Sequence, residues 1–210
     1  MAKWAHRYAQ LGFTVLLPAQ RAHELSEGRY VGMGLLESDD LLGWVSLITA
    51  ADPDARILLH GNSMGAATVM AAGDARLPRN VVAAISDCGY SSVVSQFTDN
   101  AEEMFRLPHS LAALLVKVAS HVSERKAGYR FEDASCVKAL RHATIPMMFI
   151  HGGADTFVNP KYLDINYNAC ASIDREKLLI PGADHTMSAS TDPDRYWRRV
   201  NSFVKRVFGL

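Results

Sequence analysis

Five short runs of apolar residues, none alternating with polar residues, constrain the fold of this chain more than any other feature. A strand that faces water on one side alternates apolar and polar side chains, whereas a continuously apolar strand is covered on both faces. A parallel sheet with helices above and below provides that environment. The five runs cover residues 13–17, 56–60, 81–86, 146–151 and 177–180.

The segments between these runs have the apolar spacing of amphipathic helices. Asp192 followed by Pro193 and Asn159 followed by Pro160 are typical helix starts, and a further helix is expected to begin near Ser38 or Asp39. Helices and strands therefore alternate along the chain. This order predicts an α/β fold, a three-layer sandwich around a mostly parallel sheet of about five strands.

The length of 210 residues fits a single domain that covers residues 1–210. The stretch between the third and fourth apolar runs is longer than a simple crossover needs, and it contains two helix-like pieces near residues 93–105 and 111–123. We therefore expect a packed helical insertion above the sheet. Its apolar residues Met104, Phe105, Leu111 and Leu114 are candidates to line a substrate pocket, with a plain structural role as the alternative.

Composition excludes several classes of function. Lys plus Arg and Asp plus Glu number 22 each, which leaves no electrostatic footprint for nucleic acid or an anionic membrane. The three cysteines form no C-x-x-C pair, so neither a metal site nor a cofactor site is expected. The N-terminus does not resemble a signal peptide, and no apolar run is long enough for a bilayer. We expect a cytoplasmic location, leaving open an anchor encoded upstream of Met1 in a longer product.

One motif carries chemistry. Gly61-Asn62-Ser63-Met64-Gly65 is a G-x-S-x-G sequence that directly follows an apolar run and precedes the small residues of 66–72. Strand, tight turn and helix form the context of a nucleophile elbow, which presents Ser63 at a helix N-terminus. Glycines at both flanking positions are expected to avoid collisions in that turn. A merely structural glycine turn is the alternative.

A serine nucleophile needs a base and a carboxylate that orients it. Asp155 follows the fourth apolar run and His185 follows the fifth, so both are expected at the carboxyl edge of the sheet together with Ser63. Asp87, directly after the third run, is the rival acid. The alternatives are that Asp155 only caps a turn and that His185 is a solvated loop residue. Cys88 is expected to be a packed thiol.

These segments resemble the α/β-hydrolase superfamily, in particular bacterial serine hydrolases described as cell-surface or prolyl-oligopeptidase-like. The resemblance rests on 61–70, on Ser86 to Ser92, on His151 to Asp155 and on Gly182 to His185, and it extends over nearly the whole chain. It implies a catalytic triad of Ser63, Asp155 and His185 and a helical cap over the active site, residues 90–143. The backbone N–H of Met64 would be one donor of the oxyanion hole.

The resemblance also implies strands that this chain lacks. Such hydrolases carry several strands before the point that corresponds to Met1, one of which ends in a His-Gly loop that supplies the second oxyanion donor. We therefore expect an N-terminally truncated core with no identified second donor and with exposed sheet edges. Exposed sheet edges favour self-association, so we expect that the chain can form a homo-oligomer.

The expected activity is that of a serine hydrolase that cleaves a carboxylic ester or related acyl bond in a small-molecule substrate. Two other classes stay open at this point. One is a catalytically impaired fragment or scaffold that keeps the hydrolase fold, and the other is a peptidase or acyltransferase with the same triad.

Overall fold

The computed structural model describes residues 1–73 and 77–210. Within them, a four-stranded sheet has the order β1-β2-β3-β4, and every neighbouring pair is parallel. The strands are β1 (Ile57–Asn62), β2 (Val81–Asp87), β3 (Met147–Gly152) and β4 (Arg175–Ile180). The helices are α1 (Ala2–Gln10), α2 (Leu35–Ala51), α3 (Met64–Ala72), α4 (Val93–Phe105), α5 (His109–Ala127), α6 (Cys136–Leu140), α7 (Lys161–Ala169), α8 (Ser188–Thr191) and α9 (Pro193–Phe208).

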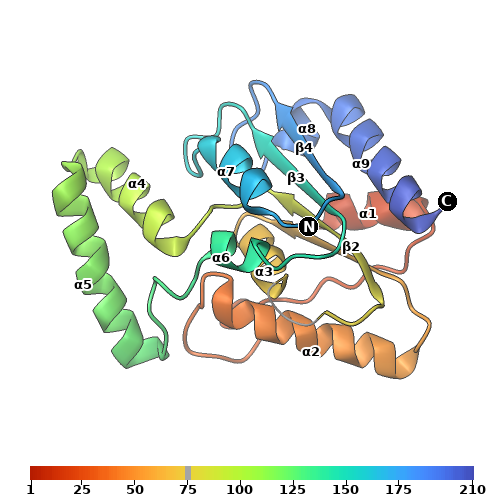
Figure 1. The fold of residues 1–210 in the computed structure, drawn as a ribbon, viewed down its shortest axis with the longest axis horizontal. Coiled ribbons are helices and arrows are strands. Elements are labelled where there is room, and N and C mark those ends of the chain that lie inside the picture. Colours follow the sequence, from red (N-terminus) through yellow and green to blue (C-terminus); the bar gives the residue numbers. More distant parts are fainter. Residues whose placement is uncertain (74–76) are drawn as a thin grey trace.

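The sheet is the middle of three layers (Figure 1). Helices α1, α8 and α9 cover one face, where Trp4, Tyr196 and Phe203 pack against Ile85 and Ile150 of the strands. Helices α2, α3, α6 and α7 cover the other face. Burial on both faces explains why the strands are continuously apolar, and it confirms the α/β class predicted from the sequence.

The four runs that follow residue 50 form strands, but the prediction of a strand at 13–17 is wrong. This segment is extended and has no strand assignment. Phe13 and Val15 pack in part against the core that includes α9, and the ring of Phe13 lies 5.1 Å from that of Phe208. Leu16 and Leu17 are each 49% exposed. An apolar run predicts burial, whereas a strand also requires a hydrogen-bonded neighbour. The sheet therefore has four strands rather than five.

Helix α2 begins earlier than the sequence predicts. Its first residue is Leu35, not a residue after Ser38 or Asp39. The carboxylate of the buried Glu37 accepts hydrogen bonds from the backbone N–H groups of Gly32, at 2.6 Å, and Gly34, at 2.7 Å. Because these bonds satisfy amides ahead of the first turn, the helix can start at Leu35.

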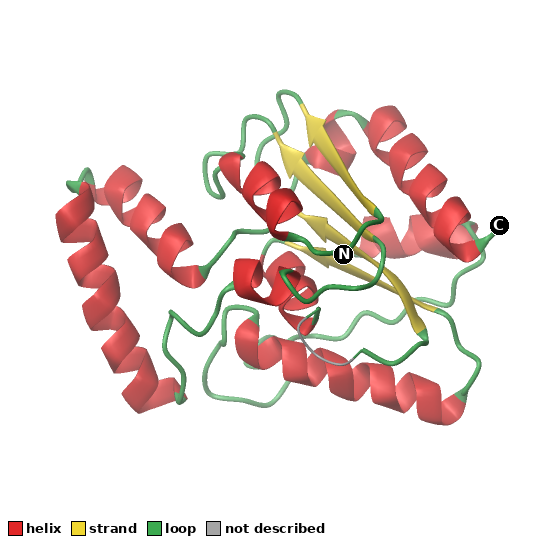
Figure 2. Cartoon of the chain, in the orientation of Figure 1, coloured by secondary structure: helices red, strands yellow, loops and turns green. Residues whose placement is uncertain are grey.

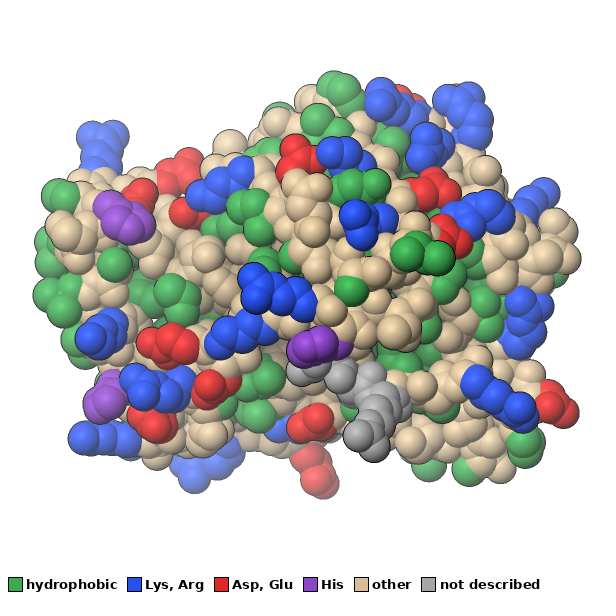
Figure 3. Space-filling model, viewed as in Figure 1, with side chains coloured by type: hydrophobic (Ala, Val, Ile, Leu, Met, Phe, Trp, Pro, Cys, Tyr) green, Lys and Arg blue, Asp and Glu red, His purple; other side chains and the backbone are tan. Residues whose placement is uncertain are grey.

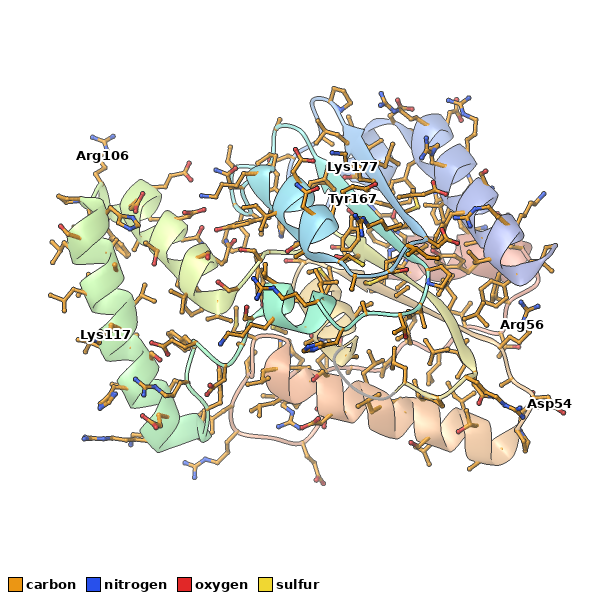
Figure 4. All side chains as sticks on the ribbon, in the orientation of Figure 1. Asp54, Arg56, Arg106, Lys117, Tyr167 and Lys177 are labelled. Atoms are coloured by element: carbon orange, nitrogen blue, oxygen red, sulfur yellow. The ribbon has the colours of Figure 1, made fainter. Side chains whose placement is uncertain are left out.

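Helices α4 and α5 form an antiparallel pair that projects from the body of the molecule (Figure 2). They lie at the bounds that the apolar spacing predicts for the two helix-like pieces, with α5 longer by a few residues. Over the sheet, Lys177 of β4 lies against the ring of Tyr167 of α7, with its Nζ 5.1 Å from the ring centre (Figure 4). No helix in the described residues is both long and apolar enough to span a membrane.

The four residues proposed to line a pocket do not do so. Met104, Phe105, Leu111 and Leu114 are exposed, by 69%, 67%, 42% and 56%. The hollow between α4, α5 and the loop at 30–33, of about 340 Å³, is lined by other residues, among them Phe97, Tyr129 and Phe131. The helical period shows which residues share a face, but it does not show which face turns inward.

Candidate active site

Ser63 lies in the turn between β1 and α3. Its φ of 56° and ψ of −118° are a strained combination for a residue with a side chain. The turn is held by a hydrogen bond from the backbone N–H of Ser63 to the carbonyl oxygen of Asp87, at 2.9 Å. Cys88 and Thr186, which flank the site, also have positive φ values, of 50° and 61°. Strain of this kind concentrates where a structure holds functional groups in place.

The tight turn requires glycine at one of its two flanking positions. A Cβ added to Gly61 would lie 1.9 Å from the carbonyl oxygen of Gly65, whereas a Cβ added to Gly65 would meet nothing within 4 Å. The expectation that both glycines avoid collisions is therefore wrong for Gly65. The turn brings the backbone of Gly65 and Ala66 so close to Gly61 that only glycine fits at position 61.

His185 joins Ser63 across a long stretch of sequence. Its Nε2 lies 2.8 Å from the hydroxyl oxygen of Ser63, and its Nδ1 lies 2.8 Å from Oδ2 of Asp155. An ionised carboxylate can only accept, so the ring proton belongs on Nδ1. Nε2 is then free to accept the proton of the Ser63 hydroxyl. The ring is half-buried and lies 5.0 Å from the ring of Phe157.

Asp155 is buried and receives four polar contacts. Its Oδ1 accepts hydrogen bonds from the backbone N–H groups of Phe157, at 3.0 Å, and Val158, at 2.8 Å. Its Oδ2 faces His185 and also lies 3.3 Å from Nε2 of His151. Burial alone would raise the pKa of this carboxyl, but the hydrogen bonds from His151, His185 and Val158 outweigh it and hold the pKa well below its usual range. The carboxylate is thus ionised and fixed. Asp155 therefore has both roles at once: its Oδ1 caps the turn at 155–158, and its Oδ2 contacts His185.

Asp87, the rival acid, is the last residue of β2, and its side chain reaches toward α9. It is fully buried, and its Oδ2 accepts a hydrogen bond of 2.9 Å from the hydroxyl of Tyr196 in α9. Burial raises the pKa of Asp87 to about 6. The structure therefore brings Asp155, and not Asp87, to Nδ1 of His185.

The thiol of Cys88 lies close to Asp155 and His185. Cys88 is fully buried, and its Sγ, an oxygen of Asp155 and a ring nitrogen of His185 all lie within 4.8 Å of one another. Such a set could in principle hold a metal ion. However, burial raises the pKa of the thiol, which disfavours the thiolate that binds metals, and Asp155 and His185 already hydrogen-bond each other. The donor set fits proton transfer better than metal binding.

Met64 is the first residue of α3. Backbone N–H groups in the first turn of a helix have no acceptor within it, and the helix dipole favours negative charge at this end. The N–H of Met64 is thus placed beside Ser63 as a candidate donor to an oxyanion.

Sequence reasoning missed several residues that support the site. Nε2 of His151, near the end of β3, lies 2.9 Å from the carbonyl oxygen of Val158 and 3.3 Å from Oδ2 of Asp155. Gln96 of α4 donates a 2.6 Å hydrogen bond to the carbonyl oxygen of Phe157, which joins the helical pair to the loop that carries Asp155. Gln96 carries no recognisable motif, whereas the His-Gly-Gly-Ala-Asp run could have pointed to His151.

The remaining strand-end histidine belongs to the core. Nδ1 of His60 lies 2.6 Å from the hydroxyl of Tyr8, and burial lowers the pKa of His60 to about 3. It is therefore neutral at physiological pH and takes no part in the site around Ser63.

No protein-family model matches the chain. Among curated proteins it is similar to the uncharacterized protein YqkD of Bacillus subtilis (strain 168), with 26% identity over 206 residues. The match covers 98% of this chain and 66% of that protein, so the chain spans about two thirds of the length of this relative.

Solved structures resemble the chain more closely in fold than in sequence. The esterase Pf2001 of Pyrococcus furiosus matches with a TM-score of 0.67 and 20% identity, over 89% of this chain and 68% of the esterase. A monoacylglycerol lipase of Paleococcus ferrophilus matches with a TM-score of 0.59 and 13% identity, over 88% and 80%. An acylaminoacyl peptidase of Pyrococcus horikoshii matches with a TM-score of 0.58 and 15% identity, over 83% and 28%. These three enzymes are members of the α/β-hydrolase superfamily, and the chain has the α/β-hydrolase fold.

Proposed function

We propose that this protein is a serine hydrolase that cleaves a carboxylic ester or a related acyl bond. The observation that carries the proposal is the continuous chain of hydrogen bonds from Ser63 through His185 to Asp155, with both distances at 2.8 Å. The esterase, lipase and peptidase among the similar structures support the hydrolase class.

The proposed reaction begins with attack of the Ser63 hydroxyl oxygen on the acyl carbon of the substrate. Nε2 of His185 takes the hydroxyl proton as the new carbon–oxygen bond forms, and Asp155 stabilises the imidazolium that results. The N–H of Met64 donates to the developing oxyanion, a contact of a kind worth about 10²–10³ in turnover.

The attack produces a tetrahedral intermediate, which then collapses to an acyl-enzyme. His185 returns its proton to the leaving alcohol, which departs, and a water molecule takes its place. His185 removes a proton from that water as it attacks the acyl carbon. It then returns this proton to the oxygen of Ser63 as the bond between that oxygen and the acyl carbon breaks, and the acid product leaves. The fixed charge and position of Asp155 allow the same imidazole to act as base and acid in turn.

A serine, histidine and aspartate arranged in this way can act on esters or on amides, so assays with both classes of substrate separate the open alternatives. We expect hydrolysis of short-chain nitrophenyl esters by the wild-type protein and none above background by Ser63→Ala. Faster turnover of aminoacyl anilides than of esters would favour a peptidase. Transfer of the acyl group to an added alcohol in preference to water would favour an acyltransferase. Folded protein without activity on any of these would favour a scaffold.

Cys88→Ser is a matched control for this assay. The buried thiol lies beside the proposed machinery but has no role in the reaction as written. A folded Cys88→Ser protein that keeps ester hydrolysis, compared with the inactive Ser63→Ala, assigns the nucleophile to the hydroxyl and not to the neighbouring thiol.

A further inference from the structure

Most of the larger apolar residues of helix α5 are exposed. The face that contacts the body consists of small or short residues, with Ala112, Val116 and Ser120 buried. Outside that face, α5 carries five apolar side chains that are exposed by 42% to 56% and that we call the outer stripe: Leu111, Leu114, Leu115, Val118 and Val122. Val122, at one end of the stripe, also borders the hollow lined by Phe97 and Phe131. A surface helix normally directs its apolar stripe toward the core. Apart from Val122, the side chains of the stripe pack against neither core cluster of the described residues.

Exposed apolar side chains gather along the edge of the molecule that α5 forms, interrupted by charged residues (Figure 3). Met104 and Phe105, at the end of α4, add to this patch where the chain turns into α5. The turn itself is marked by Arg106, whose side chain points away from the body (Figure 4).

The spacing along the outer stripe favours another helix as its occupant. Leu111, Leu115, Val118 and Val122 follow one another at intervals of four, three and four residues. This is the alternation of a and d positions that lets two helices pack with knobs in holes. These intervals keep the four side chains on one narrow stripe along α5, which suits a second helix better than a broad, flat partner.

The area is sufficient for a stable pair. At roughly 100 Å² for each of the seven exposed side chains, the patch offers on the order of 700 Å² on one copy and about 1,400 Å² on two, within the range of specific protein interfaces. Patches above a few hundred Å² on a monomer commonly mark interaction sites.

Charge at the two ends of α5 selects the orientation. Its last turn carries Glu124, Arg125 and Lys126, which together are basic, whereas Glu102, Glu103 and Arg106 near its start are together acidic. Glu102 also contacts His109 of the same copy. A parallel arrangement of two copies would bring the basic ends together. An antiparallel arrangement brings each basic end toward the acidic residues of the other copy.

We propose that the outer stripe of α5 is a homodimer interface, in which the α5 helices of two copies pack antiparallel about a two-fold axis between Leu115 and Val118. In this register Leu111 lies opposite Val122 of the second copy, and Leu115 lies opposite Val118. A two-fold axis makes each contact occur twice. The interface does not depend on the proposed hydrolase function.

Sedimentation velocity tests the surface. The wild-type chain is expected to be dimeric at tens of micromolar, and the double variant Leu115→Glu, Val118→Glu to dissociate at least tenfold more readily. The control Leu47→Glu, Ile173→Glu makes the same change of charge at apolar residues exposed by 62% and 101% elsewhere, and it is expected to dimerise like the wild type. Circular dichroism first checks that the two variants fold like the wild type. We expect them to, because the substituted side chains lie on the surface.

Disulfide trapping tests the register. A mixture of Leu111→Cys and Val122→Cys proteins is expected to form a mixed disulfide. Leu111→Cys alone is expected to form none, because positions 111 and 122 lie about 16 Å apart along a helix and two copies of position 111 are then too distant to bridge. The three native cysteines are buried.

Three results would overturn the proposal. One is a wild-type chain that stays monomeric at tens of micromolar. Another is a stripe variant that dimerises as well as the control. The third is a monomer that cosediments with vesicles of phosphatidylcholine and phosphatidylglycerol through Leu115 and Val118, which would assign the stripe to a lipid surface.

Discussion

One carboxylate oxygen of Asp155 lies 2.8 Å from Nδ1 of His185, while its other oxygen is held by two backbone N–H groups of its own loop. In Asp155→Asn, the side-chain amide can turn its NH₂ group toward Nδ1 and favour the wrong tautomer of His185. We expect a loss in kcat on the order of 10³–10⁴, with a much smaller change in KM. Steady-state hydrolysis of a nitrophenyl ester provides the measurement.

Asp87→Asn is the matched substitution at the rival carboxylate. Because Asp87 contacts Tyr196 and is not the carboxylate at Nδ1 of His185, we expect this variant to keep kcat within a few-fold of the wild type. Full activity in Asp155→Asn together with a large loss in Asp87→Asn would show that the acid is misassigned.

The turn at Ser63 makes a sharp prediction about its glycines. Gly61→Ala would force a Cβ to within 1.9 Å of the Gly65 carbonyl oxygen, so the backbone must move. We expect a loss of about 3 kcal/mol or more in the free energy of unfolding. Gly65→Ala, which meets open space, is expected to be neutral or slightly stabilising, because alanine favours the helix. Urea unfolding of both variants checks this, and equal losses would contradict the geometry described for the turn.

The buried Asp87 predicts a pH dependence of stability. Burial raises its pKa from 3.8 to about 6, so between these values the folded chain holds a proton that the unfolded chain has released. The free energy of unfolding therefore falls as the pH rises through this window, by on the order of 3 kcal/mol in total, and the loss persists above it. Asp87→Asn removes this loss while keeping an oxygen that can accept from Tyr196.

We therefore expect Asp87→Asn to be more favourable, relative to the wild type, at pH 8 than at pH 4. The comparison across pH cancels any constant cost of the substitution. Denaturant unfolding at both values gives the difference directly. An effect of Asp87→Asn that is the same at pH 4 and pH 8 would mean that the folded and unfolded chains ionise this carboxyl alike.

Local patterns predicted the parts of the fold that depend on adjacent residues. The run from Ile57 to Ala72 holds a strand, a turn and a helix within one short segment, so the sequence alone placed Ser63 in its turn. Asp155 and His185 each follow a parallel strand, and such strands end at the same sheet edge. Their proximity to Ser63 was therefore predictable, although the individual hydrogen bonds were not.

The features that the sequence missed depend on distant partners. Residues 13–17 are as apolar as a strand, but strand formation also needs a neighbour to pair with. Leu111 and Leu114 were candidates to line a pocket, but their exposure depends on which face of α5 packs against the body, and Ala112, Val116 and Ser120 form that face. The choice between the two acids depends on strand geometry: Asp87 shares a face with Ile85, which packs toward α9, so its carboxylate reaches Tyr196 and not Nδ1 of His185.

Labelling with a fluorophosphonate tests the central claim most directly, since this reagent reacts far faster with a serine hydroxyl that a neighbouring base activates than with an ordinary hydroxyl. We predict stoichiometric labelling of the wild-type protein, with the phosphonate mapped by peptide mass spectrometry to Ser63, and no labelling of Ser63→Ala. His185→Ala should be labelled far more slowly, because it keeps the hydroxyl and loses the base. Well-folded wild-type protein that remains unlabelled, or that is labelled at another residue, would contradict the assignment of Ser63 as an activated nucleophile.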